Sequence, residues 1–285
     1  MKERSLIAFT LLAQAAAGVY GVLGAIYARV SLEVGPQTAR LQTRWGFLAV
    51  TGLMVLAMAA ALLHLGTPLL AWRALWNLRS SWLSREILAT VLFSAASAAW
   101  AGLLWLDISA LWLQYAAYGA GAALGLALLL SMSWAYRLRT VPAWDTWATP
   151  VGFITTALLL GGLGAWTAVE AAPGPNPPLW LQQALPLGTI GLLSVEFLYV
   201  PLWLVGLAGR PGAAAEALRR LTRDRRVLFQ GRLLLMIAGI ALAGALLAPL
   251  GLPTRSLLVA TFLVVLAAEA IGRILFYTAY AREGV

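Results

Sequence analysis

Few side chains in this 285-residue sequence could carry out chemistry. The chain has no Cys and a single His, His64. Disulfides, thiolate-bound metals, iron–sulfur clusters and thioether-linked haem are therefore excluded, and a bis-histidine haem cannot form within one chain. The sequence also shows no phosphate-binding glycine motif, nucleophile triad or metal-ligand spacing. Any redox role must use a bound organic molecule or the cofactors of a partner protein.

One pair of ionisable residues interrupts the apolar runs near their ends, where buried charges are costly and point to function. His64 ends one run, and Glu86, next to Arg85, lies about one turn into the following run. We expect both at a similar depth near one membrane face. A base, a carboxylate and nearby Trp rings beside lipid suit a quinol, whose oxidation releases two protons. The alternative is a His at a helix end and a Glu paired with Arg85.

Other polar residues inside the runs have simpler interpretations. Glu269 and Arg273 are four residues apart, which predicts an ion pair within one helix. Glu196 has no cation on its own helix, so we expect it to be protonated or hydrogen-bonded to another span, with a proton path as the alternative. Gln14 could bond a neighbouring helix. Elsewhere the middle of the spans is mostly Leu, Ala and Gly.

The composition determines the class of protein that must position these residues. Apolar residues make up 61% of the chain, charged residues make up 11%, and the mean hydropathy is +0.84. A soluble domain has roughly a quarter charged residues, so the sequence indicates an integral membrane protein. Each span needs roughly 20 apolar residues. We predict an all-α bundle of eight transmembrane helices in a single membrane domain, residues 1–285, with spans at about 5–28, 45–66, 82–106, 111–134, 149–170, 180–206, 228–248 and 257–280.

Several segments outside the spans are also informative. The first apolar run is too long for a signal peptide, whose core has about 7–15 residues, so we expect an uncleaved span. Thr67 and Pro68 can start a short interfacial helix over 67–80, which would arch over His64 and Glu86. Residues 213–226 form a second, strongly basic amphipathic helix. The weakest boundary lies between the third and fourth spans, where only Asp107 and Ser109 interrupt the apolar run.

The distribution of positive charge predicts an orientation. Eight spans place both termini on one side, which carries 15 of the 20 Lys and Arg residues, against four on the other side. The positive-inside rule therefore makes the terminal side cytoplasmic, in a prokaryotic plasma membrane. The net charge of +9 is scattered between apolar segments, which argues against nucleic acid and favours membrane lipid or an acidic protein partner.

A resemblance to a known family adds to these expectations. The run LHLGTPLLAWRALWNLRSSWLSREI (63–87) resembles the signature of the membrane-anchor subunits of the dimethyl sulfoxide reductase family. Further matching pieces are FTLLAQAAAG (9–18), RTVPAWDTWATPVGF (139–153) and AEAIGRILFY (268–277). The resemblance covers all eight spans in order. It implies an anchor without haem, metal or cluster of its own, bound to a four-cluster ferredoxin-like iron–sulfur subunit and a molybdopterin catalytic subunit.

The resemblance also implies menaquinol as the bound substrate and electron donor. The His and Glu of the family's quinol site fall on His64, in HLGTP, and on Glu86, in SREI. The residues expected to bind the quinol are His64, Gly66, Pro68, Trp72, Ser84, Arg85 and Glu86.

Two points remain open at this stage. The resemblance implies termini on the outer side of the membrane, whereas the Arg count places them inside; arginines that form a docking face would mislead the charge rule. We take the terminal side as cytoplasmic, and expect quinol and partner to share one face because electrons must pass directly between them. The alternatives to this function are an anchor of a polysulfide- or tetrathionate-class reductase, and a secondary transporter with its polar site at the bilayer midplane.

Overall fold

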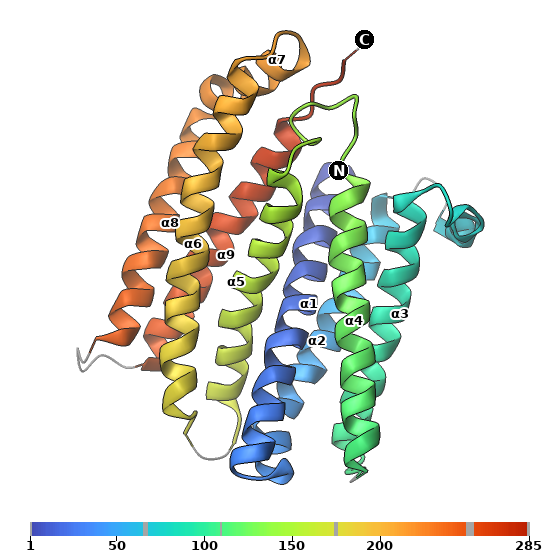
Figure 1. The fold of residues 1–285 in the computed structure, drawn as a ribbon, viewed down its shortest axis with the longest axis vertical. Coiled ribbons are helices and arrows are strands. Elements are labelled where there is room, and N and C mark those ends of the chain that lie inside the picture. The colour runs from blue at the N-terminus through green and yellow to red at the C-terminus, as the bar shows by residue number, and fades with distance from the viewer. Residues whose placement is uncertain (1, 65–67, 109, 174–175, 249–253, 284–285) are drawn as a thin grey trace.

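The computed structural model describes residues 2–64, 68–108, 110–173, 176–248 and 254–283. Eight long helices run along a common direction (Figure 1). They are α1 (Lys2–Glu33), α2 (Pro36–His64), α3 (Trp82–Trp105), α4 (Leu111–Ala135), α5 (Ala148–Ala171), α6 (Leu179–Ala208), α8 (Arg226–Leu247) and α9 (Thr254–Thr278). All eight are long and apolar enough to cross a membrane. The predicted all-α bundle of eight transmembrane helices is confirmed.

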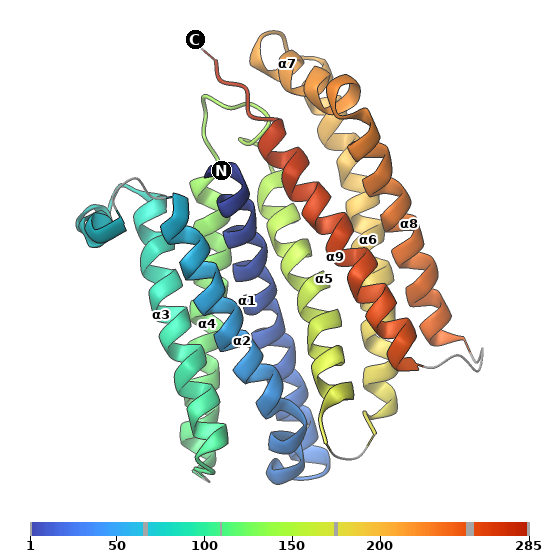
Figure 2. The same ribbon diagram turned by 180° about the vertical axis from the view of Figure 1, so that it is seen from behind.

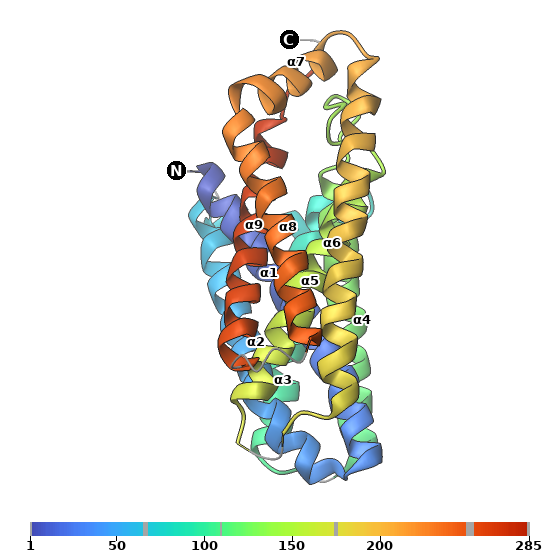
Figure 3. The same ribbon diagram turned by 90° about the vertical axis from the view of Figure 1, so that its left-hand side faces the viewer.

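Three shorter elements lie at one end of the bundle. They are the 3-10 helix η1 (Pro68–Asn77), the helix α7 (Ala213–Arg219) and the π-helical turn η2 (Arg220–Asp224). The start of α1 and the end of α9 lie at the same end, which we call the terminal face (Figures 1 and 2). The side view shows α7 lying across this end, above the long helices (Figure 3). The opposite end is the far face.

The helices are longer than the predicted spans, most of all at the first connection. The sequence suggested a polar gap over 29–44, but the chain is helical there except at Val34 and Gly35. Gly35 has φ +107°, a left-handed conformation that favours glycine, and Pro36 begins α2. Arg29 and Glu33 form an ion pair of 2.8 Å one turn before this corner. Polar helix ends therefore project beyond the apolar spans.

The third and fourth spans are separate helices, although few polar residues mark the boundary between them in the sequence. α3 ends at Trp105, and Asp107 adopts a positive φ of 56° before α4 begins at Leu111. The Asp107 carboxylate pairs with Arg40 of α2, so the connection is tied to a neighbouring helix. Ser109 lies outside the described residues.

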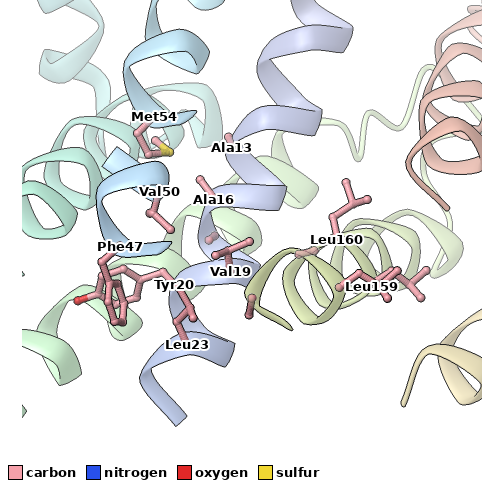
Figure 4. Close-up of a cluster of buried hydrophobic side chains, with 14 of the residues drawn as sticks. Ala13, Ala16, Val19, Tyr20, Leu23, Phe47, Val50, Met54, Leu159 and Leu160 are labelled. Atoms are coloured by element: carbon pink, nitrogen blue, oxygen red, sulfur yellow. The ribbon is translucent and has the colours of Figure 1, made fainter. Parts of the chain in front are cut away.

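The centre of the bundle is the contact between α1 and α5, which joins the two halves of the chain. A Cβ atom on Gly18 would lie 1.8 Å from the carbonyl oxygen of Ala157, so this close approach requires glycine. Tyr20 of α1 packs edge-on against Phe47 of α2, with ring centroids 5.4 Å apart (Figure 4). The first half of the chain thus forms a well-packed frame for α3, which carries Glu86.

Candidate functional site

Glu86 lies in the first turns of α3, near the terminal face. Ser81 caps this helix, because its Oγ accepts a hydrogen bond from the backbone N of Ser84 at 3.2 Å. The cap fixes the start of the helix and so the depth of Glu86. The Glu86 residue is only 4% exposed and Ser84 only 3%. A carboxyl group is therefore held inside the protein about one turn from the start of α3.

Arg85 does not form the alternative ion pair with Glu86. Its Nε donates to the carbonyl oxygen of Leu78 and its Nη2 to that of Arg79, both at 2.9 Å. The guanidinium also lies 4.2 Å from the ring centroid of Trp82. Arg85 therefore holds the chain that leaves η1 against the start of α3, and its positive charge is directed to carbonyl oxygens.

The structure describes only part of the segment that carries the other predicted quinol residues. His64 is the last residue of α2, which packs against α3, but the side chains of residues 64–71 lie outside the described part of the structure. Gly66 and Thr67 lie outside it altogether, and Pro68 begins η1. The end of α2 and the start of α3 are thus at the same face, as the spacing of His64 and Glu86 predicts.

The short helix η1 lies at the rim of the bundle, beside the end of α3, and does not arch over its centre (Figures 1 and 2). Trp72 is 52% exposed. Its ring packs against Trp76, with centroids 5.9 Å apart, and under the guanidinium of Arg73. The exposed rings of η1 are suited to the lipid interface. The short helix that was expected to lie above Glu86 therefore lies beside the bundle instead.

Two tyrosines that the sequence analysis did not assign to the site lie near Glu86. The hydroxyl of Tyr277, in the last turn of α9, donates to the hydroxyl of Tyr136, just after α4, at 2.7 Å. Tyr136 directly follows α4, which packs against α3, so the pair lies beside the helix that carries Glu86. The sequence offered one signal, since Tyr277 follows Glu269 and Arg273 on one helix face.

A second polar site lies in the other half of the bundle, and we call Glu196, Arg232, Glu269 and Arg273 the ionic cluster. Arg232 Nη2 lies 2.7 Å from Glu196 Oε2 and 3.7 Å from Glu269 Oε1. Thr155 donates to Glu196 at 2.6 Å, and Thr156 donates to Glu269. Glu196 therefore bonds to other spans, as one of the sequence interpretations expected.

The predicted ion pair between Glu269 and Arg273 is wrong. Arg273 Nη2 instead donates to Gln14 Oε1 of α1 at 2.7 Å, and its guanidinium lies 3.9 Å from the ring centroid of Phe153. Arg232 takes its place beside Glu269 because Gly272 leaves room: a Cβ there would lie 2.7 Å from the guanidinium carbon. Glu196 lies near the middle of α6, so the ionic cluster is a polar exception in the largely apolar middle of the bundle.

The ionic cluster borders a small cavity of about 60 Å³, lined among others by Thr149, Tyr199, Arg232, Glu269 and Arg273. That volume holds a few water molecules and is far below the roughly 300–1,000 Å³ of a drug-sized ligand site. The Nε atoms of Arg232 and Arg273 and Oε1 of Glu269 have no hydrogen-bond partner among the described residues. Water is the ligand that fits this cavity, whereas a quinone ring does not.

The terminal face carries a strongly basic surface at α7, η2 and the start of α8. We call it the basic face, and it consists of Arg219, Arg220, Arg223, Arg225 and Arg226. Within it, Arg219 and Arg220 bind Glu216, each at 2.8 Å. The Arg220 and Arg219 guanidiniums hold the pKa of the Glu216 carboxyl below its ordinary value. Arg223, Arg225 and Arg226 are exposed. This surface lies at the same end of the bundle as the start of α3, which carries Glu86 (Figure 1).

The described residues contain no group of three or more His, Asp or Glu side chains placed to hold a metal ion.

Comparisons with known proteins identify the family of the chain. A model of the family described as "DMSO reductase anchor subunit (DmsC)" matches residues 1–279. The protein is 28% identical to the anaerobic dimethyl sulfoxide reductase chain YnfH of Escherichia coli over 292 residues, covering 99% of this sequence and 96% of the relative. It is 27% and 26% identical to two further anaerobic dimethyl sulfoxide reductase subunits, one from Escherichia coli and one from Haemophilus influenzae, with the same coverage. The resemblance noted in the sequence is confirmed, and the chain belongs to the family of dimethyl sulfoxide reductase membrane-anchor subunits.

Proposed function

We propose that this membrane anchor oxidises menaquinol at Glu86 and His64 and passes the electrons to an iron–sulfur subunit docked on the terminal face. The observation that carries the proposal is the burial of the Glu86 carboxyl, 4% exposed, one turn inside α3. Such a group in a membrane protein is costly to keep without a function. The SREI motif around it is the part of the sequence that resembles the family's quinol site.

The chemistry follows from the residue types. A quinol hydroxyl must lose its proton as the ring is oxidised, and a carboxylate within hydrogen-bond reach accepts it. The O–H bond of the quinol breaks, Glu86 takes the proton, and the two electrons of the ring leave to the partner's iron–sulfur clusters. His64 is the second acceptor, since an imidazole takes up a proton near neutral pH.

The basic face supports the placement of the partner. Exposed Arg223, Arg225 and Arg226 offer positive charge on the side where Glu86 lies, which suits an acidic docking surface. A molybdopterin catalytic subunit would then be reached through the iron–sulfur subunit, and the terminal acceptor would be chosen there. We also propose, from the count of positive charges, that the terminal face is cytoplasmic.

The test is quinol turnover by the purified complex. Glu86→Gln keeps the shape of the side chain but cannot accept a proton, so turnover of a menaquinol analogue should fall about 100-fold or more. His64→Ala should lower both turnover and the affinity for a quinone analogue. Reduction of the acceptor by an artificial dye should continue, because a dye can feed the partner subunits directly.

The matched control is Glu170→Gln, at the far-face end of α5, where Glu170 lies 3.4 Å from exposed Arg255. This variant should turn over quinol at the wild-type rate. If Glu86→Gln does the same, the quinol is oxidised elsewhere.

A further inference from the structure

The buried position of Glu86 raises a question about the protons that quinol oxidation releases. Each turnover delivers two protons, and a carboxyl that is 4% exposed has little access to bulk water. The Glu86 carboxyl must lose its proton before it can accept another one. A path of exchangeable hydrogens from Glu86 to water is therefore required by the proposed function.

The Tyr136 and Tyr277 hydroxyls are placed to form this path. They are 2.7 Å apart, and Tyr136 directly follows α4, the helix that packs against α3 and so lies beside the helix of Glu86. A tyrosine hydroxyl can donate one hydrogen bond while it accepts another, so two in contact can pass a proton along. Thr10 of α1 and Arg273 of α9 are the other polar groups that face the pair.

Aromatic packing holds the two rings in place. Tyr136 lies edge-on to Trp144, with ring centroids 5.5 Å apart, and edge-on to Phe276 at 5.7 Å. The Trp144 indole N–H is already bound to the carbonyl oxygen of Phe276 at 2.7 Å, so it does not compete for the hydroxyls. The pair is therefore a fixed polar contact in an aromatic surrounding.

The far end of the pair reaches a groove on the terminal face, which shares Arg220 and Arg225 with the basic face proposed to dock the partner. Tyr277 lines an open groove of about 890 Å³ on the terminal face, together with Arg4, Arg220, Asp224 and Arg225. Asp224 and Arg225 are exposed. Three of these charged residues are cationic, and Asp224 is anionic. The Asp224 carboxylate can accept a proton from Tyr277. The net positive charge of the groove then favours release of that proton to bulk water.

We propose that Tyr136 and Tyr277 form a proton exit that connects Glu86 with this groove. The inference rests on the proposed quinol oxidation at Glu86. The proton leaves the protonated Glu86 carboxyl and reaches the Tyr136 oxygen through a bridging water. The Tyr136 proton then moves to the Tyr277 oxygen, and the Tyr277 proton passes to water in the groove. The transfer leaves Tyr277 donating to Tyr136, which is the bond that the structure shows. Rotation of the two hydroxyls, so that Tyr136 donates to Tyr277 and Tyr277 donates to the groove, prepares the next transfer.

The experiment uses the purified complex with a short-chain menaquinol analogue as donor. Tyr136→Phe and Tyr277→Phe each remove one hydroxyl and keep the ring. Both variants should lower kcat about 10-fold or more, which can be a smaller loss than the roughly 100-fold or more contributed by a group that transfers a proton in the transition state. KM and the affinity for a quinone analogue should stay within about 2-fold, since ring binding is untouched. The solvent deuterium isotope effect on kcat should rise, because proton transfer limits the rate.

Tyr118→Phe is the matched control, since Tyr118 is a partly buried tyrosine of α4 whose hydroxyl donates to the carbonyl of Gly21 at 3.2 Å. It should leave kcat and the isotope effect unchanged. Added imidazole should restore part of the rate to Tyr277→Phe by carrying protons through the groove. A purely structural defect would not respond to imidazole, so this arm separates loss of the relay from loss of packing.

The outcomes distinguish the two proposals. Wild-type kcat in both tyrosine variants, with Glu86→Gln inactive, refutes the proton exit and leaves the quinol site intact. Wild-type turnover in Glu86→Gln refutes the quinol site itself. Loss of kcat without a change in the isotope effect and without imidazole rescue also overturns the relay.

Discussion

Replacing Arg232 by Met should strongly destabilise the second half of the bundle. Arg232 is the cation of the ionic cluster that lies beside Glu196 and Glu269, which are 0% and 2% exposed. Met fills a similar volume with no charge. Both carboxylates would lose their guanidinium partner at 2.7 and 3.7 Å in a part of the protein that is closed to bulk solvent apart from a small cavity.

The expected loss follows from what breaking a buried pair costs. Removing one partner leaves an uncompensated charge, worth about 3–5 kcal/mol. A triple variant with Glu196→Gln and Glu269→Gln added should recover most of that loss, because the amides are neutral and can still bind Thr155 and Thr156. Arg255→Met is the control: its side chain is 74% exposed beside Glu170, and such pairs contribute roughly 0–1 kcal/mol.

The assay is unfolding of the purified anchor in detergent micelles by added SDS, followed by circular dichroism. We expect Arg232→Met to unfold at clearly lower SDS than the wild type, and the triple variant to lie close to the wild type. Equal shifts for Arg232→Met and Arg255→Met would refute the assignment of Arg232 as the cation that stabilises the cluster.

The remaining predictions concern cofactors, docking and topology. The purified anchor should show no haem absorbance band, because one His and no Cys supply too few ligands; a band that stays with the isolated protein would contradict this. Arg223→Glu with Arg226→Glu should release the iron–sulfur and catalytic subunits from membranes, more so at high salt, whereas an intact and active complex would make this surface a lipid contact. Gly212→Cys introduces the only Cys of the sequence beside α7, and a membrane-impermeant thiol reagent should reach it only from the cytoplasmic side.

The sequence predicted the bundle well because each span is a local property. Runs of apolar residues long enough to cross a bilayer identify helices without knowledge of their neighbours. The first corner was missed because Arg29 and Glu33 appeared to belong to a loop, although they form a helical ion pair. Gly35 followed by Pro36 was the local signal for a two-residue turn.

Contacts between helices were harder to predict. Glu269 has a cation four residues away on its own helix, yet its partner is Arg232 of α8. Local spacing could not show that Gly272 opens space for that guanidinium, or that Arg273 turns toward Gln14. Arg232 does lie inside a predicted span, which was a signal that it needed a buried anion.

The candidate site was predicted in part. His64 and Glu86 were selected as rare ionisable groups at neighbouring span ends, and the ends of α2 and α3 do lie at one face. The tyrosine pair was not predicted, because Tyr136 and Tyr277 are 141 residues apart and meet only through the fold. Trp72 was expected over the site, but the short helix that carries it lies at the rim (Figure 1).

Photoaffinity labelling with an azido-quinone analogue tests the central claim most directly, because it reports where the ring binds. In the complex, the label should be found on peptides from residues 64–90, and it should be displaced by menaquinol. Glu86→Gln should still be labelled, because this variant loses the proton acceptor but still binds the quinone ring. A competing apolar groove between α1, α4, α5 and α6 is lined by Gly21, Leu126, Leu158 and Trp180. Specific labelling of that groove, with none on 64–90, would contradict a quinol site at Glu86.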